Sequence, residues 1–101
     1  MRCYYVFVHG RLDWLPEPSA SEDAGAIKPA GFYCHRYVLA GSEATAVETA
    51  FRRVRQNLNT RAGWLRDGLA TLDLEAEEVA IAGIHNLLKP DNRGHTFYED
   101  E

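Results

Sequence analysis

The feature that most constrains the fold of this chain is the segment 32–58, in which a strand pattern leads directly into a helix pattern. Aromatic and β-branched side chains dominate residues 32–40, and Gly31 and Gly41 bound them, which is typical of a β-strand. Successive side chains of a strand face opposite sides. One side would carry Phe32, Cys34, Arg36 and Val38, and the other Tyr33, His35, Tyr37 and Leu39. Because neither side is polar throughout, we expect this strand inside a sheet, with a helix on one side and a loop, a ligand or a second subunit on the other.

The helix pattern follows directly after residue 41. Apolar residues recur there at steps of three and four, which predicts one buried stripe of an α-helix. Ser42 stands just before the pattern, where a side-chain oxygen can accept a hydrogen bond from a backbone N–H and cap the helix. We expect the helix to end near Asn59, because Asn and Thr side chains compete there for backbone hydrogen bonds. The predicted stripe consists of Ala44, Val47, Phe51, Val54 and Leu58.

Three further segments have strand patterns. Residues 3–9 form a continuous apolar run, and we expect residues 11–15 to extend that strand or to fold back on the sheet. Residues 71–77 alternate between apolar and acidic side chains, as a strand with one covered face does. Residues 95–98 predict a last short strand after a turn.

Two segments fit more than one structure. Residues 60–70 have helical spacing but contain two glycines, which weaken a helix, so we expect a short second helix or a helical turn that packs Trp64 on the core. Residues 76–88 fit a helix and also a continuing strand. We expect a strand to about Glu77 and then a short helix to Leu88.

These elements predict one α+β domain over residues 1–101. The expected fold is a small open sheet of three to four mostly antiparallel strands, with helices packed on one face. The ferredoxin-like sandwich is the common arrangement of this kind, and the topology stays open. Proline, glycine, serine and acidic residues predict a mobile loop over residues 16–30. Residues 99–101 are expected to form a solvated acidic tail.

The composition limits the classes of partner. A net charge of −4 argues against DNA or RNA, because binding to phosphates requires a basic surface. No apolar run approaches the roughly 18 residues that a membrane span needs, so we expect no membrane association. The two cysteines, Cys3 and Cys34, are expected to be free buried thiols in a reducing cytosol. A cytoplasmic protein without a bound cofactor is therefore predicted.

Residues that could carry catalysis do not form a recognisable local motif. No two of the four histidines, His9, His35, His85 and His95, stand at the short spacing of a local metal site, so no metal site is predicted. Both cysteines lie in aromatic strands, where an inert thiol is expected. The adjacent acids Glu77 and Glu78 would point apart on a strand. The glycines are scattered and form no phosphate loop, so catalytic residues are not indicated.

The most informative feature for function is a surplus of aromatic residues on the two best strands. A sheet covered by one good helix cannot bury all of them, and contiguous exposed apolar surface marks an interface or a binding groove. We expect a non-enzymatic interaction domain that forms a homodimer through this face or that binds another protein. In one version of the second case, the chain is an acidic inhibitor or immunity-type protein that covers a basic partner. The alternative is a small-molecule-binding protein or enzyme with a pocket between the sheet and the loop 10–31. The expected binding face consists of Tyr5, Phe7, His9, Tyr33, His35, Arg36 and Tyr37.

Overall fold

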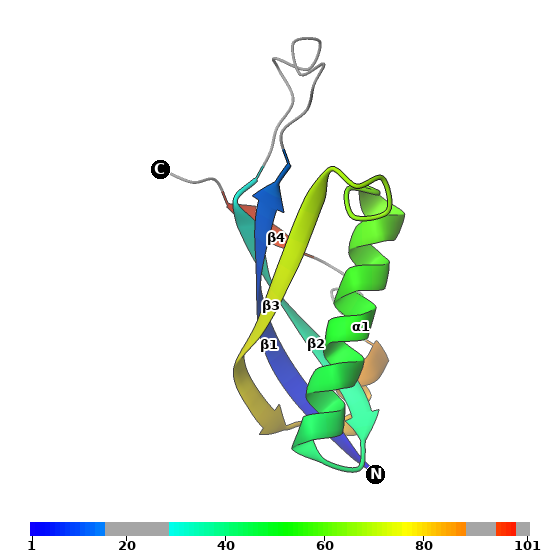
Figure 1. Cartoon of the computed structure of the whole chain (residues 1–101). Helices are drawn as coiled ribbons and strands as arrows, with labels where there is room; N and C mark the ends of the chain where they lie inside the picture. The colour runs from blue at the N-terminus through cyan, green and yellow to red at the C-terminus, as the bar shows by residue number, and fades with distance from the viewer. Residues whose placement is uncertain (16–28, 89–94, 99–101) are drawn as a thin grey trace.

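The structure is a computed structural model that describes residues 1–15, 29–88 and 95–98. The described chain forms a four-stranded antiparallel sheet in the order β3-β1-β2-β4, with one α-helix against one face (Figure 1). This confirms a small α+β fold with an open antiparallel sheet. The elements in chain order are β1 (Arg2–Trp14), β2 (Gly31–Ala40), α1 (Glu43–Arg61), β3 (Ala70–Ile81), the 3₁₀ helix η2 (Ile84–Leu88) and β4 (Thr96–Tyr98).

The ferredoxin-like arrangement is not confirmed. That arrangement follows the order β-α-β-β-α-β, whereas the described elements run β1-β2-α1-β3-η2-β4 and include one α-helix. Most of the expected mobile loop and all of the expected acidic tail lie outside the described residues, so these two expectations stay untested.

Strand β1 lies at the centre of the sheet because it pairs with both long neighbours. It pairs with β2 from Arg2 to Arg11 and with β3 from Tyr4 to Trp14. The expected extension beyond residue 10 is therefore confirmed. At its far end the indole Nε1 of Trp14 donates to the carbonyl of Pro29 over 2.8 Å. The side chains of its even-numbered residues face the core, and those of its odd-numbered residues lie on the opposite face of the sheet, where they are partly exposed from Tyr5 to His9.

Residues 60–88 differ from the expectation in the length of β3. Of the two structures expected for residues 60–70, a short helix or a helical turn, the chain forms turns, in which the backbone N–H of Asp67 donates to the carbonyl of Gly63. Both Gly63 and Gly68 adopt positive φ angles, of 70° and 72°, that end helical geometry. Trp64 does pack against the core, as expected. The strand that was expected to stop near Glu77 continues to Ile81, because β1 offers pairing partners as far as Tyr4. Pairing with a neighbour thus outweighs the local helical spacing.

Helix α1 begins as predicted, and its buried residues agree with the predicted stripe at Val54 and Leu58. The hydroxyl of Ser42 accepts from the backbone N–H of Thr45, which confirms the N-cap, and the helix ends at Arg61. The predicted Ala44 is exposed, while Val47 and Phe51 flank the contact. Small residues at the centre let the helix approach the sheet closely. The buried residues are Ala46, Ala50, Val54 and Leu58.

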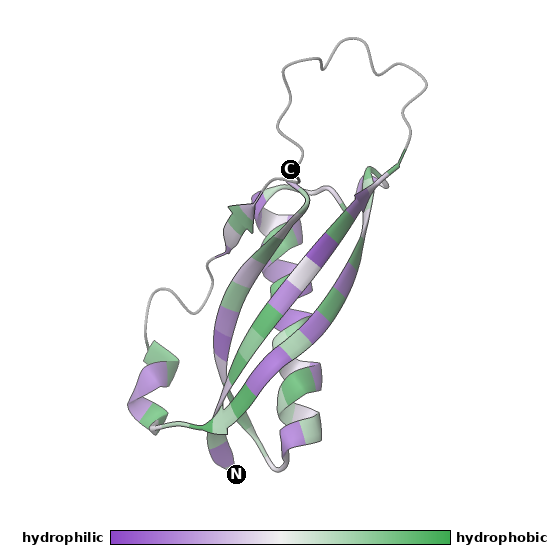
Figure 2. Cartoon of the chain, turned by 90° about the vertical axis from the view of Figure 1, so that its left-hand side faces the viewer, coloured by the Kyte–Doolittle hydropathy of each residue, from purple (hydrophilic) through white to green (hydrophobic). Residues whose placement is uncertain are grey.

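The core lies between α1 and the sheet. It is formed by the even-numbered residues of β1 and β2 with the start of β3 and the inner side of α1. Side chains that are fully buried there include Val6, Val8, Phe32 and Val38. The opposite face of the sheet is turned away from this core. In Figure 2 that face is toward the viewer, and α1 lies behind the strands.

Candidate functional site

Six of the seven expected binding residues lie together on the face of the sheet that is turned away from α1. Strands β1 and β2 pair so that Phe7 is opposite His35 and His9 is opposite Tyr33. Because paired residues share a face, the odd-numbered residues of both strands come together there. We call this surface the open face. Its central residues are Tyr5, Phe7, His9, Tyr33, His35 and Tyr37.

Arg36 is the exception and corrects the expected set. It lies on the other side of β2, fully buried against α1. Its guanidinium donates to the carbonyl of His35 over 2.7 Å and to Oδ1 of Asn57 over 3.0 Å. The alternation of a strand places residue 36 on the opposite side from residues 35 and 37. Arg36 therefore cannot supply a polar group to the open face and instead helps to hold β2 to the helix.

The aromatic side chains on the open face pack against one another in a row across β1, β2 and β4. Ring centroids are 5.5 Å apart for Tyr5 and Tyr37, 5.7 Å for Phe7 and Tyr33, and 5.5 Å for Tyr33 and Tyr98. These distances are typical of favourable aromatic pairs. Tyr33 and Leu39 nevertheless each keep 40% of their surface exposed. Within the part of the chain that the structure describes, the elements outside the sheet, α1 and η2, do not lie in front of this row (Figures 1 and 2).

Strand β3 gives the open face an acidic border. The register places Asp73 opposite Arg11, Glu75 opposite His9 and Glu78 opposite Phe7. Between the last two pairs the register shifts, so Glu77 is the extra residue of a β-bulge. Burial and the nearby charge of Glu78 raise the pKa of the Tyr5 hydroxyl, which therefore stays protonated at neutral pH.

His9 is the residue at which the aromatic row meets this acidic border. Its ring stacks on Tyr33 with centroids 4.5 Å apart, and its Nε2 is 2.5 Å from the hydroxyl of Tyr98. On the other side of the ring, Nδ1 lies 3.5 Å from Oε1 of Glu77. The possible ligand atoms of His9, Glu75 and Glu77 all lie within 4.8 Å of one another. The two β-strands thus bring one imidazole and two carboxylates to one point.

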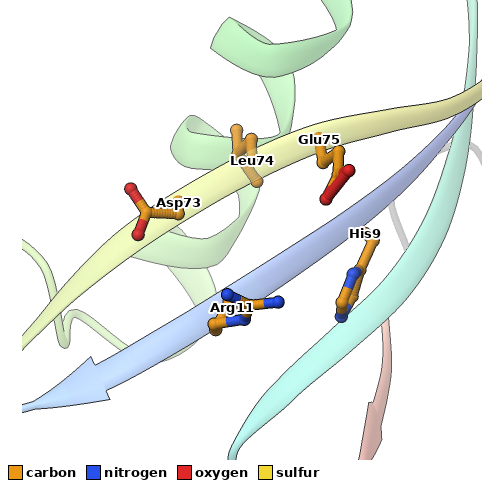
Figure 3. A pocket seen from close by; sticks show the side chains of 5 residues that line it. All are labelled: His9, Arg11, Asp73, Leu74 and Glu75. Carbon is orange, nitrogen blue, oxygen red and sulfur yellow. The ribbon is translucent and has the colours of Figure 1, made fainter.

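A shallow hollow of about 140 Å³ lies beside this point. It is lined by His9 and Arg11 from β1 and by Asp73, Leu74 and Glu75 from β3 (Figure 3). Figure 3 shows the side chains of His9 and Glu75 on neighbouring strands. The hollow is large enough for water or an ion and is smaller than the roughly 300 Å³ at which pockets for organic ligands begin.

The cysteines do not take part in this site. Cys34 lies on the covered side of β2, and burial raises the pKa of its thiol to about 11, so the reactive thiolate is scarce at neutral pH. Burial also raises the pKa of Cys3. Both are free and buried, as the sequence predicted.

Sequence reasoning missed three residues of the site, namely Glu75, Glu77 and Tyr98. They come from strands far along the chain from His9, and only the strand order and register bring them together. The acidic alternation of residues 71–77 did signal which side of β3 faces away from the core. The other two histidines lie elsewhere: His85 is exposed on η2, and His95 packs on Phe32 at the covered side.

Comparison with known proteins gives no relative for this chain. No family model, no curated protein and no solved structure matches it. None of the helices that the structure describes is long and apolar enough to cross a membrane. The function is therefore inferred from the residues of the open face.

Proposed function

We propose that this protein is a non-enzymatic interaction domain that forms a homodimer by packing the open faces of two copies together. The observation that carries the proposal is the row of partly exposed aromatic residues on a face that no described element outside the sheet covers. Tyrosine and phenylalanine are enriched in protein interfaces because they bury a large area at a low cost in conformational entropy.

The area of the open face supports an interface of adequate size. Strand β2 has 10 residues, which corresponds to about 33 Å, and three long strands at their usual spacing of about 4.8 Å span about 14 Å. The flat area is then roughly 450 Å² for each copy, and side chains and β4 add to it. Two copies would bury roughly 1,000–1,500 Å², which reaches the size of specific interfaces.

The charge pattern of the open face is compatible with a two-fold axis parallel to the strands. Such an axis lays the β3 side of one copy over the β2 and β4 side of the other. The acidic residues of β3 would then meet Tyr33, His35 and Tyr98 of the second copy instead of its acids. Sheets packed in this way lie about 10 Å apart with interleaved side chains. The proposal includes a cytoplasmic location, because buried free thiols suit a reducing compartment.

A basic protein is the second candidate for the occupant of this face. The observation that favours it is the acidic border of β3, where Asp73, Glu75, Glu77 and Glu78 are all exposed. A pocket for an organic ligand between the sheet and the loop 10–31 has less support among the described residues. The hollow at that end, lined by Arg11, Leu12, Asp13, Ala30 and Tyr98, measures about 190 Å³, below the usual range of about 300–1,000 Å³.

Sedimentation velocity of the purified full chain at micromolar concentrations tests the homodimer. The wild type should sediment as a dimer. Phe7→Ala and Tyr33→Ala should each weaken the dimer at least about tenfold, because truncation of a central aromatic hot-spot residue costs about 2 kcal/mol or more and a tenfold change requires about 1.4 kcal/mol. Ile84→Ala is the matched control, since Ile84 is 66% exposed on η2, away from the open face. A monomeric wild type, or a dimer that both aromatic variants leave unchanged, would overturn the proposal.

A further inference from the structure

We propose that His9, Glu75 and Glu77 form a binding site for a divalent transition-metal ion, with Zn²⁺ as the first probe. All three ligands come from one chain, so the site does not need a second copy, although His9 also belongs to the open face that the proposed dimer covers. The donor set is one imidazole nitrogen and two carboxylate oxygens, which is common for such ions in proteins.

The distances within the cluster fit two ligands of one ion better than they fit a direct hydrogen bond. Nδ1 of His9 and Oε1 of Glu77 are 3.5 Å apart. A charge-assisted hydrogen bond would be about 2.7–2.9 Å long. In a tetrahedral site with metal–ligand bonds of about 2.0–2.2 Å, neighbouring ligand atoms are about 3.3–3.6 Å apart. A carboxylate oxygen of Glu75 lies within 4.8 Å of both.

The imidazole is held in the orientation that metal binding requires. Nε2 hydrogen-bonds with the hydroxyl of Tyr98, and in the metal-bound form Nε2 would carry the proton and donate to this hydroxyl. Nδ1 then presents its lone pair toward the glutamates. Metal-binding histidines generally use their second nitrogen in this way, because it fixes the tautomer and the ring orientation. Stacking on Tyr33 restricts the ring further.

The bulge in β3 explains why two glutamates can reach the same imidazole. Glu75 is opposite His9 in the register, and Glu77 is the extra residue at the register shift. Bulges redirect side chains and are common beside functional sites. The side chain of His9 is only 13% exposed, whereas that of Glu77 is 41% exposed. The nitrogen ligand is thus fixed, and at least this carboxylate is free to close on an ion.

The donor set also selects the class of metal. Ca²⁺ and Mg²⁺ prefer oxygen ligands throughout and take six or more of them, whereas an imidazole favours Zn²⁺ and its neighbours in the first transition series. Three protein ligands leave a fourth position for water or an anion. The expected site is therefore one Zn²⁺ for each chain, with one exchangeable ligand.

Isothermal titration of the full-length protein with Zn²⁺ tests this inference. The wild type should bind one ion per chain, and Glu77→Gln and His9→Gln should each weaken binding by at least about tenfold. Glu78→Gln is the matched control, because it removes the same charge one residue further along from an exposed side chain outside the cluster. It should leave the affinity nearly unchanged. Circular dichroism checks that each variant is folded. Glu77→Gln should disturb folding less than His9→Gln, because the side chain of Glu77 is more exposed than that of His9.

Each of the remaining outcomes overturns the metal site. If Zn²⁺ does not bind, His9 and Glu77 interact only with each other and do not form a metal site. Equal loss in Glu78→Gln would show a general attraction of cations to the acidic border. The Phe7→Ala variant separates this test from the dimer, because a monomer of that variant should still bind Zn²⁺. If the wild type binds the ion and monomeric Phe7→Ala does not, a single chain does not supply the site.

Discussion

Neighbouring residues of β2 have very different surroundings because they face opposite sides of the sheet. His35 lies on the open face against Tyr5, with ring centroids 5.8 Å apart, whereas Arg36 is buried on the helix side beside Asn57. Gly10 shows the same precision of packing on β1. A Cβ atom at that position would collide with the buried ring of Phe32. A substitution in this sheet therefore has to suit the face on which its side chain lies.

His95 should make the stability of the protein depend on pH. Burial lowers the pKa of its imidazole to about 4, with the charges of Arg36 and Arg61 acting in the same direction and the carbonyl of Val54 opposing them in part. An unfolded histidine has a pKa of about 6.5. Between these two values the unfolded chain binds a proton that the folded chain does not. The contribution of His95 to stability is therefore complete above about pH 6.5 and is lost as the pH falls toward 4.

The variant His95→Gln removes this titration. Urea unfolding at about pH 7 and about pH 4.5 should show a smaller loss of stability in the variant than in the wild type, by about 2 kcal/mol. The full difference in pKa corresponds to about 3 kcal/mol, and partial contact of the ring with water reduces it. Equal losses in the two proteins would show that His95 is not the group responsible.

At the level of elements, the contact between α1 and the sheet is set by two alanines that are fully buried. Ala46 and Ala50 are each 0% exposed, and their small side chains allow close approach of the helix axis to the sheet. Ala50→Leu should lower the free energy of unfolding by about 1–3 kcal/mol, because the extra carbons have no space in a packed core. Ala44→Leu is the control: that residue is exposed on the same helix, and its substitution should change stability by less than about 0.5 kcal/mol. Urea denaturation measures both, and equal effects would contradict the observed face of the helix.

The same helix shows what sequence periodicity can and cannot predict. The pattern predicted the helix itself, its cap at Ser42 and the inward positions Val54 and Leu58, because large apolar residues dominate such a pattern. It assigned the other inward positions to Ala44, which is exposed, and to Val47 and Phe51, which flank the contact. It did not select Ala46 and Ala50, which make the contact. Packing distance decides this choice, and packing distance is not encoded in spacing along one helix.

Strand pairing explains the rest of the difference between expectation and structure. The alternation of residues 71–77 predicted β3 and its exposed side, but the continuation to Ile81 depends on β1 as a neighbour. For the candidate site, the aromatic residues of β1 and β2 could be found because each strand has its own alternation. The proximity of His9 to Glu75, Glu77 and Tyr98 could not be predicted from the sequence, because it depends on the strand order and on the bulge.

At the level of the whole molecule, the acidic edge of the sheet favours association through the open face. Edge strands can pair with other chains unless charge or short length prevents it. Strand β3 forms one edge and carries Asp73, Glu75, Glu77 and Glu78, which makes it a poor template for a neighbouring strand. At the other edge β4 has only 3 residues and pairs with residues 31–33 of β2. Packing of faces therefore has one competing mode, pairing along residues 34–40 of β2.

The response of the association to salt distinguishes a homodimer from a complex with a basic protein. Each chain has a net charge of −4, so two copies repel each other while their aromatic faces attract. The Debye length falls from about 30 Å at about 0.01 M salt to about 10 Å at about 0.1 M salt, which weakens the repulsion and leaves the burial of apolar surface unchanged. Sedimentation velocity should therefore show a homodimer that becomes several-fold tighter over this range, and Glu78→Gln should reproduce part of that gain at low salt.

A complex held by the acidic border and a basic partner would weaken over the same range, because salt screens attraction between opposite charges. Dissociation of the homodimer by salt would mean that opposite charges hold the two copies together, in place of the aromatic row.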